Sequence, residues 1–416
     1  MPVLRPRLIG PCVEAAFEAS PVVILEGGRA VGKSTVCDLL IDRHGWAARF
    51  DLSDADQLAT LRLDPGRFLS AQAVPCVIDE AQLEPRVTIW VKRLVDKRRM
   101  AGQFLLTGSA RLGRDQLGGS DPLAGRATRL RMWSMTAGEI DGRKADFVER
   151  VFGAGWEPKR ATAHRANVIP RAWNGGLPAV PGVLSAASVA DWERAIASYV
   201  EAVIPLGVTG TRADLGRLLR TFRHFAANSG QLVNYARAAN DLAMQAATVR
   251  NHLEQLESCF LLVRAEAHRP MEHRVVTAHP RVFAADVGLA AWASRAWAGA
   301  PSAATTGSLF ETSVAHDVMA QCDAHPDRVV VRHWRDNRNK LEVDLLLAHP
   351  DGRVVAIETK ASSTVGPDDT KGLLAFVDSA PERCHRCVVI YDGSRVVDLT
   401  PAGHPCDVLA VPRLLV

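Results

Sequence analysis

The chain has 416 residues, of which 47% are hydrophobic and 23% charged, and its formal net charge is +4. At about 100–200 residues per domain this length fits several domains, and the balanced composition excludes a disordered, fibrous or histone-like protein. No run approaches the roughly 20 apolar residues of a membrane span, and the N-terminal segment lacks the apolar stretch of a signal peptide. We therefore expect a cytoplasmic protein with no membrane partner.

Two residue types stand out by their scarcity. Only 8 of the 50 basic residues are lysine, so each lysine raises the question of why an arginine does not stand in its place. The 8 cysteines are too sparse for a disulfide scaffold. The single CxxC motif, Cys384 to Cys387, has no second pair at zinc-ribbon spacing, so ordinary thiols are favoured there over a metal site.

Short apolar runs alternate with helical patterns over residues 1–150, which is typical of a parallel α/β domain. The predicted elements in chain order are a strand at 22–25, a helix at 34–44, a strand at 74–78, a helix at 88–99 and a strand at 103–106.

A phosphate-binding motif, G-x-x-x-x-G-K-S, lies between the first strand and the first helix. Its glycines let backbone N–H groups surround a β-phosphate, Lys33 supplies a compact charge to the β- and γ-phosphates, and the Ser34 hydroxyl ligates Mg²⁺. The motif predicts ATP and Mg²⁺ as ligands. The predicted nucleotide-binding residues are Gly27, Gly28, Arg29, Ala30, Val31, Gly32, Lys33, Ser34 and Thr35.

The second strand ends in Asp79 and Glu80, as in a Walker B motif. We expect Asp79 to hold the Mg²⁺ shell with Ser34, and Glu80 to polarise the attacking water. Taken alone, two carboxylates at a strand end would equally suit a helix cap.

Two further residues are candidates for the catalytic set with Lys33 and Glu80. Thr107 ends the third strand, where a γ-phosphate sensor or a simple turn is expected. Arg126 follows a loop predicted at 118–122, and it would neutralise transition-state charge in its own subunit or in a neighbouring one.

The middle of the chain, residues 151–300, is predicted to be helical and to end in a hairpin formed by residues 260–263 and 274–276. Helices at 237–242 and 245–257, followed by this hairpin, give the layout of a winged helix-turn-helix. Thr248, Arg250, Asn251 and Gln255 point away from the apolar face and suit DNA or RNA, while a structural or protein-binding role remains equally open. Residues 298–306 are predicted to be a linker.

The C-terminal part, residues 301–416, returns to an α/β pattern that carries a second candidate site. Glu311 lies on a predicted helix at 308–321, Asp344 on one strand, and Glu358 and Lys360 on the next. Carboxylates with a lysine at this spacing suit a second Mg²⁺ or Mn²⁺ ion and a metal-activated water. The alternative is a buried ion-pair network. The local excess of acidic residues is unfavourable for binding phosphates, which weakens the case for nuclease activity.

Several segments together resemble prokaryotic AAA-type ATPases that carry a winged helix and a C-terminal restriction-endonuclease-like domain of unknown function. The matching segments are residues 27–35, 77–80, 104–110, 123–126, 175–178, 239–257, 282–289 and 342–362. The resemblance implies an α/β fold with a P-loop AAA-type ATPase domain at 1–150, a helical and winged-helix domain at 151–300, and a PD-(D/E)xK-like domain at 301–416.

The same resemblance implies ATP hydrolysis with Lys33, Ser34, Asp79 and Glu80. It places Glu311, Asp344, Glu358 and Lys360 at the positions of a nuclease-like core, and it suggests an antitoxin-like partner. A homo-oligomer would be required if Arg126 acts on a neighbouring subunit, while a monomer is equally compatible with the sequence. One departure is that the sensor strand offers Thr107 and Ser109 but no asparagine.

We therefore expect a Mg²⁺-dependent ATPase whose nucleotide state is coupled to the winged helix and the nuclease-like domain on a nucleic acid. The alternatives are an ATP-gated metal-dependent nuclease and a non-catalytic, nucleotide-gated interaction module of a toxin–antitoxin or conflict system.

Overall fold

The computed structural model describes residues 5–46, 48–112, 121–158, 173–185, 187–207, 212–268, 279–336, 338–380 and 383–416. The chain divides into two compact units, one of Met1–Ser134 with Ser258–Phe260 and the other of Met135–Glu257 with Leu261–Val416. Most of the predicted loop at 118–122 and the hairpin strand predicted at 274–276 lie outside the described residues.

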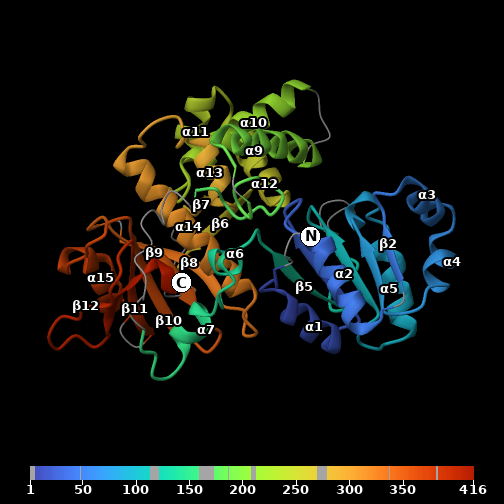
Figure 1. The fold of residues 1–416 in the computed structure, drawn as a ribbon, viewed down its shortest axis with the longest axis horizontal. Helices are drawn as coiled ribbons and strands as arrows, with labels where there is room; N and C mark the ends of the chain where they lie inside the picture. Colours follow the sequence, from blue (N-terminus) through green and yellow to red (C-terminus); the bar gives the residue numbers. More distant parts are fainter. Residues whose placement is uncertain are drawn as a thin grey trace. The chain divides into compact units, whose positions relative to one another are not determined.

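The N-terminal unit contains a five-stranded sheet in the order β2-β3-β4-β1-β5, in which every neighbouring pair is parallel (Figure 1). Its strands are β1 (Val22–Gly27), β2 (Ala48–Asp51), β3 (Cys76–Asp79), β4 (Phe104–Gly108) and β5 (Ala127–Met132). Its helices are α1 (Gly10–Ala19), α2 (Lys33–His44), α3 (Ala55–Leu63), α4 (Pro65–Ser70) and α5 (Val87–Lys97), with a short 3-10 turn at Ala81–Leu83.

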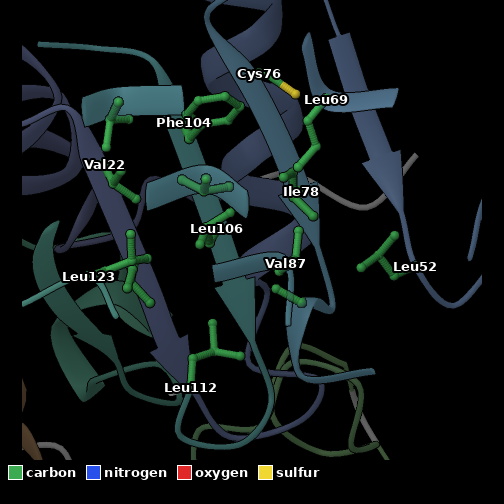
Figure 2. Close-up of a cluster of buried hydrophobic side chains, with 14 of the residues drawn as sticks. Val22, Leu52, Leu69, Cys76, Ile78, Val87, Phe104, Leu106, Leu112 and Leu123 are labelled. Carbon is green, nitrogen blue, oxygen red and sulfur yellow. The ribbon is translucent and has the colours of Figure 1, made fainter. Parts of the chain in front are cut away.

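Continuous apolar runs explain the three central strands of this sheet. All residues of β1, β3 and β4 are buried, which is the pattern expected of parallel strands that are covered on both faces. Val22, Ile78 and Leu106 belong to one core cluster with Val87 of α5, and Figure 2 shows their side chains together. This core fixes the carboxyl ends of the strands, where the phosphate-binding motif lies.

The second unit contains an eight-stranded sheet in the order β12-β13-β11-β10-β9-β8-β6-β7. Its strands are β6 (Leu262–Ala267), β7 (Arg281–Ala284), β8 (Val330–Asp336), β9 (Leu341–Ala348), β10 (Val354–Lys360), β11 (Cys384–Tyr391), β12 (Val397–Asp398) and β13 (Val408–Pro412). The sheet crosses the domain boundary predicted at residue 300, because β6 pairs in parallel with β8.

The helices of this unit precede the sheet or lie between its strands. They are α6 (Ala137–Asp141), α7 (Phe147–Phe152), α9 (Val189–Val203), α10 (Arg212–Ala227), α11 (Tyr235–Leu242), α12 (Ala246–Ser258), α13 (Val287–Ala293), α14 (Ala303–Asp323) and α15 (Lys371–Ser379). Short 3-10 turns lie at Ile204–Gly207, Pro367–Thr370 and Arg413–Leu415.

Helix α14 contains a continuous buried stretch from Thr312 to Cys322. Asp317 on this helix forms an ion pair at 2.6 Å with Arg413, and both side chains are buried. The helix begins at Ala303, inside the predicted linker, because Ser302 caps it by accepting a hydrogen bond from the N–H of Thr305. The linker prediction is therefore wrong from residue 303 onward.

The two helices predicted at 237–242 and 245–257 are present, as α11 and α12. Helices α11 and α12 are separated by a turn in which Ala243 has a φ of 51°, and β6 forms an antiparallel pair with β7. Val249, Leu253 and Leu256 of α12 are buried on one face, as their spacing predicts.

Candidate functional site

The phosphate-binding motif spans the gap between β1 and α2. Gly27 lies so close to β5 that a Cβ atom there would come within 2.1 Å of the carbonyl oxygen of Met132. Gly32 caps α2 with a φ of 103°, a conformation that L residues rarely adopt. Arg7 donates hydrogen bonds to the carbonyl oxygens of Val31 and Trp133. Gly27 thus allows the close approach to β5, Gly32 allows the turn into α2, and Arg7 binds the loop at Val31.

Lys33 points back into this loop and is 4% exposed. Its Nζ atom donates hydrogen bonds to the carbonyl oxygens of Gly27 at 2.9 Å and Gly28 at 2.8 Å, and to Ser109 Oγ at 3.2 Å. Burial lowers the pKa of Lys33 to about 8, although Glu80 and Asp79 act in the opposite direction. The ammonium group therefore lies where the motif would hold a phosphate.

Asp79 ends β3 as a buried carboxylate with several donors around it. Arg49 donates to Asp79 Oδ2 at 2.6 Å, and the hydroxyls of Thr107 and Ser34 also bond to this side chain. Burial raises the pKa of Asp79, but these hydrogen bonds and the charge of Arg49 lower it by more than burial raises it. The pKa of Asp79 is therefore below its ordinary value. An ionised carboxylate next to the Ser34 hydroxyl is an oxygen donor set that suits Mg²⁺.

Glu80 follows in a left-handed backbone conformation with a φ of 52°. Such a conformation is uncommon for a residue other than glycine, and it is found disproportionately at functional sites. The carboxylate accepts hydrogen bonds from Ser109 Oγ at 2.9 and 3.0 Å and from the amide of Gln82. Ser109 thus joins Glu80 to Lys33.

Thr107 lies among the Walker B residues rather than facing Lys33. Its hydroxyl donates to Asp79 and accepts from the backbone N–H of Glu80 at 3.1 Å. The structure therefore brings Ser109, rather than Thr107, into contact with both Lys33 and Glu80. The sequence did not indicate that Gln82 would contact Glu80 or that Arg49 would contact Asp79, because neither Gln82 nor Arg49 lies within a recognised motif.

Arg126 is not brought to the phosphate-binding loop of its own chain. Val22 pairs with Ala127 and Gly27 with Met132, so Arg126 lies at the amino end of β1 and the loop at its carboxyl end. Five residues of strand separate the two ends by about 16 Å. Arg126 instead forms an ion pair with Asp96 at 2.6 Å. A role within its own subunit is therefore contradicted by the topology, whereas a role in a neighbouring subunit stays a prediction.

The four residues predicted for the second site lie near one another in the C-terminal part of the chain. Asp344 Oδ2 accepts hydrogen bonds from the N–H and hydroxyl groups of Thr359 at 2.8 and 2.9 Å, and Lys360 Nζ donates to Glu358 at 2.9 Å. Burial and the charge of Asp344 raise the pKa values of Glu311 and Glu358.

A buried arginine occupies the middle of this carboxylate set. Arg281 of β7 forms ion pairs with Glu311, with Glu342 at 3.1 Å and with Asp344 at 3.2 Å, and its side chain is 5% exposed. The guanidinium supplies the positive charge that a divalent cation would supply, and it takes oxygen atoms that the ion would need. The residues present do not fit a second Mg²⁺ or Mn²⁺ ion, and the expectation of one is corrected. Nothing in the sequence distinguishes Arg281 among 42 arginines.

The residues predicted to face a nucleic acid differ in exposure. Arg250 and Asn251 are exposed, and Thr248 and Gln255 are half-buried. The guanidinium of Arg250 lies 5.0 Å from the ring centre of Tyr235.

Three family matches cover different parts of the chain. Residues 19–141 match an AAA domain, residues 167–298 match a domain of unknown function (DUF8612), and residues 306–410 match another (DUF4143). The AAA match covers the phosphate-binding motif and the Walker B strand. The N-terminal unit therefore combines a parallel α/β fold with a phosphate-binding motif, and most of it is similar to an AAA domain.

Relatives and solved structures add distant likenesses. Uncharacterized proteins of Mycobacterium tuberculosis and Mycobacterium bovis are each 28% identical over 278 residues, which is 66% of this chain and 56% of theirs. The chain thus spans little more than half the length of these relatives. A Walker-type ATPase of Pyrococcus abyssi has a TM-score of 0.38 at 14% identity, covering 70% of this chain and 99% of its own.

The RuvB Holliday junction branch migration motor of Thermotoga maritima has a TM-score of 0.29 at 16% identity, covering 62% of this chain and 88% of its own. At such TM-scores neither structural likeness carries an argument about function. Within the described residues, no helix is long and apolar enough to cross a bilayer.

Proposed function

We propose that this chain binds and hydrolyses ATP with Mg²⁺ at the carboxyl edge of the five-stranded sheet. The observation that carries the proposal is the convergence of three motifs on one point. Ser109 of the loop after β4 bonds both to Lys33 of the phosphate-binding motif and to Glu80 of the Walker B strand. Such a junction is what phosphoryl transfer needs, since catalysis there consists of positioning and charge stabilisation.

In this proposal each residue has a separate role. Lys33 exchanges the carbonyl oxygens of Gly27 and Gly28 for phosphate oxygens, since its three donors are already directed at the loop. Ser34 and Asp79 would hold Mg²⁺, which supplies neutralising charge to the phosphate oxygens. Glu80, oriented by Ser109 and Gln82, polarises the attacking water.

Glu80→Gln separates binding from hydrolysis. We expect this variant to bind ATP as the wild type does. Its rate of phosphate release should be at least about 100-fold lower, since a general base contributes about 10²–10⁴-fold. Glu18→Gln, an exposed residue of α1, is the matched control. Hydrolysis by Glu80→Gln at the wild-type rate would refute the assignment.

We further propose that the C-terminal unit does not cut nucleic acid and instead acts as a nucleotide-gated interaction module. Arg281, which neutralises the carboxylates, supports this choice over the nuclease alternative. Incubation of plasmid DNA and of RNA with Mg²⁺ or Mn²⁺ should give no cleavage. Cleavage that disappears in both Glu358→Ala and Lys360→Ala would show that the nuclease alternative is correct.

A role for nucleic acid in the ATPase cycle is a separate part of the proposal. The succession of α11, α12, β6 and β7, with Arg250 and Asn251 exposed, suits a winged helix that contacts DNA or RNA. We expect DNA or RNA to change the rate of phosphate release by the wild type, and Arg250→Ala to weaken that response. Arg338→Ala, which also removes an exposed arginine, should leave the response unchanged.

The predicted neighbouring-subunit role of Arg126 is tested by mixing. If Arg126 acts on a neighbour, Arg126→Ala and Lys33→Ala are each defective and their mixture recovers part of the activity. A homo-oligomer is required for that result, and an antitoxin-like partner stays a prediction.

A further inference from the structure

Three cysteines from two separate segments come together at the end of β11. Cys384 Sγ lies 3.6 Å from Cys387 Sγ and 3.6 Å from Cys406 Sγ, and the third edge of the triangle, between Cys406 and Cys387, is 3.9 Å. Cys387 and Cys406 are buried and Cys384 is half-buried. No disulfide joins them.

The local backbone explains how these side chains meet. Val354 pairs with Cys384 while Val355 pairs with Arg386, so β11 has one extra residue, a β-bulge, at this point. The bulge turns Cys384 to the same face as Cys387, although an odd number of positions separates them. The parallel pairing of Cys387 with Val408 brings Cys406, just before β13, onto that face.

The sulfur triangle has the dimensions of a mononuclear thiolate site. A zinc ion with tetrahedral ligands and Zn–S distances near 2.3 Å separates its sulfurs by about 3.8 Å. A disulfide would require about 2.05 Å between two of the sulfurs, and it would leave the third without a role.

His404 lies beside Cys406 and is our candidate for a fourth ligand, although the group of ligand atoms within 4.8 Å of one another contains the three cysteines alone. Its Nδ1 atom lies 2.8 Å from the carbonyl oxygen of Cys406, while its Nε2 atom is buried and has no hydrogen-bond partner among the described residues. A metal-bound histidine commonly donates its other ring N–H to a carbonyl in this way. The Nε2 atom of His385, within the CxxC motif, is likewise buried without a hydrogen-bond partner among the described residues, but the ring of His385 stacks on Phe152.

We propose that Cys384, Cys387 and Cys406 bind one zinc ion, that the ring of His404 turns toward it as the fourth ligand, and that the ion fastens the loop before β13 to β11. Three thiols release their protons on binding, and the closed set of four protein ligands makes the site structural rather than catalytic. The site is separate from the ATPase proposal. Sequence reasoning missed it because Cys406 is 19 residues beyond Cys387 and outside any second CxxC pair.

Metal analysis of the full-length protein, purified with a thiol reductant and without chelators, tests this proposal. We expect about one zinc ion per chain in the wild type and in Cys12→Ser, whose cysteine lies outside the triangle, and a loss of zinc in Cys387→Ser and Cys406→Ser. His404→Ala should bind zinc at least about tenfold more weakly, because each ligand contributes to affinity. Equal affinity in His404→Ala would overturn the fourth-ligand assignment.

A measurement on the wild type covers the case in which the cysteine variants do not fold. Removal of metal by a chelator should lower the Tm, and added Zn²⁺ should restore it whereas Mg²⁺ should not. Replacement by Co²⁺ should give the visible spectrum of a tetrahedral thiolate site. A wild-type protein that is folded and reduced but retains no zinc and develops no such spectrum with Co²⁺ would refute the proposal, as would a disulfide within the triangle that forms regardless of added zinc.

Discussion

Lys33 donates a hydrogen bond to Ser109 at 3.2 Å, and through it the phosphate-binding motif is joined to the end of β4. The hydroxyl of Ser109 in turn donates a hydrogen bond to the carboxylate of Glu80 at 2.9 Å. The hydroxyl therefore orders the ammonium and the carboxylate relative to each other. In a nucleotide-bound protein, this link would position Glu80 when Lys33 moves to phosphate.

Ser109→Ala should lower kcat for ATP hydrolysis about tenfold and leave KM nearly unchanged, because it removes an orienting hydrogen bond and no phosphate contact. Steady-state phosphate release measures both constants. Ser53→Ala, which alters an exposed serine of the same unit, is the control. A rise in KM at constant kcat would instead place Ser109 in ATP binding.

The affinity for ATP should fall as the pH rises above about 8. Burial lowers the pKa of Lys33 to about 8, so the nucleotide-free amine loses its charge in this range and must regain a proton to bind phosphate. The expected loss is up to about tenfold per pH unit. Titration with a fluorescent ATP analogue between pH 7 and 9.5 measures it. Lys33→Arg, which stays charged, should bind more weakly and show no such slope; an identical slope would assign the titration to another group.

Arg281→Ala should destabilise the folded protein by about 3–5 kcal/mol at pH 8, because it leaves buried carboxylates without a counter-charge. The pKa of Glu311 is already raised, and a raised folded-state pKa gives stability at low pH that is lost as the pH rises. The deficit relative to the wild type should therefore shrink toward pH 5. Urea unfolding at both pH values, with Arg338→Ala as control, decides this. A variant of unchanged stability that binds Mn²⁺ would show that the cluster is a metal site.

Asp317→Asn should be less stable than the wild type at pH 7, by an amount that falls as the medium becomes acidic. Burial opposes ionisation of Asp317, but Arg413 and His316 lower its pKa to about 2, from a reference of 3.8. A depressed folded-state pKa gives stability that is present above the unfolded value and lost as the pH falls toward 2. Asp378→Asn, an exposed position on α15, is the control. A deficit that is the same at pH 7 and pH 3.5 would argue against an ion-pair role.

The parts of the fold that the sequence predicts well are those with a strong local signal. Four consecutive buried residues in β3 and a glycine-bounded turn before α2 can be recognised without tertiary information. Strand β2 and the beginning of α14 were not predicted. β2 has only four residues, and the start of α14 depends on a single capping residue, Ser302.

The contacts that could not be predicted all join residues distant in the sequence. Arg281 contacts carboxylates that follow it in the sequence by 30 to 63 residues. These contacts form because β7 is the edge strand of the sheet that contains β9, and because α14 packs near β7. The position of Arg126 likewise depends on the direction of β5 relative to β1. Such relationships follow from strand order and register, which one sequence does not specify.

The central claim is that Lys33 and its neighbours form a working ATPase site, and the most direct test is phosphate release from ATP and Mg²⁺ by wild type, Lys33→Ala and Lys97→Ala. Lys97 is an exposed lysine of α5 and controls for the loss of a positive charge. We predict phosphate release that depends on Mg²⁺ in the wild type and in Lys97→Ala, and its loss in Lys33→Ala. Equal rates in all three proteins would contradict the account.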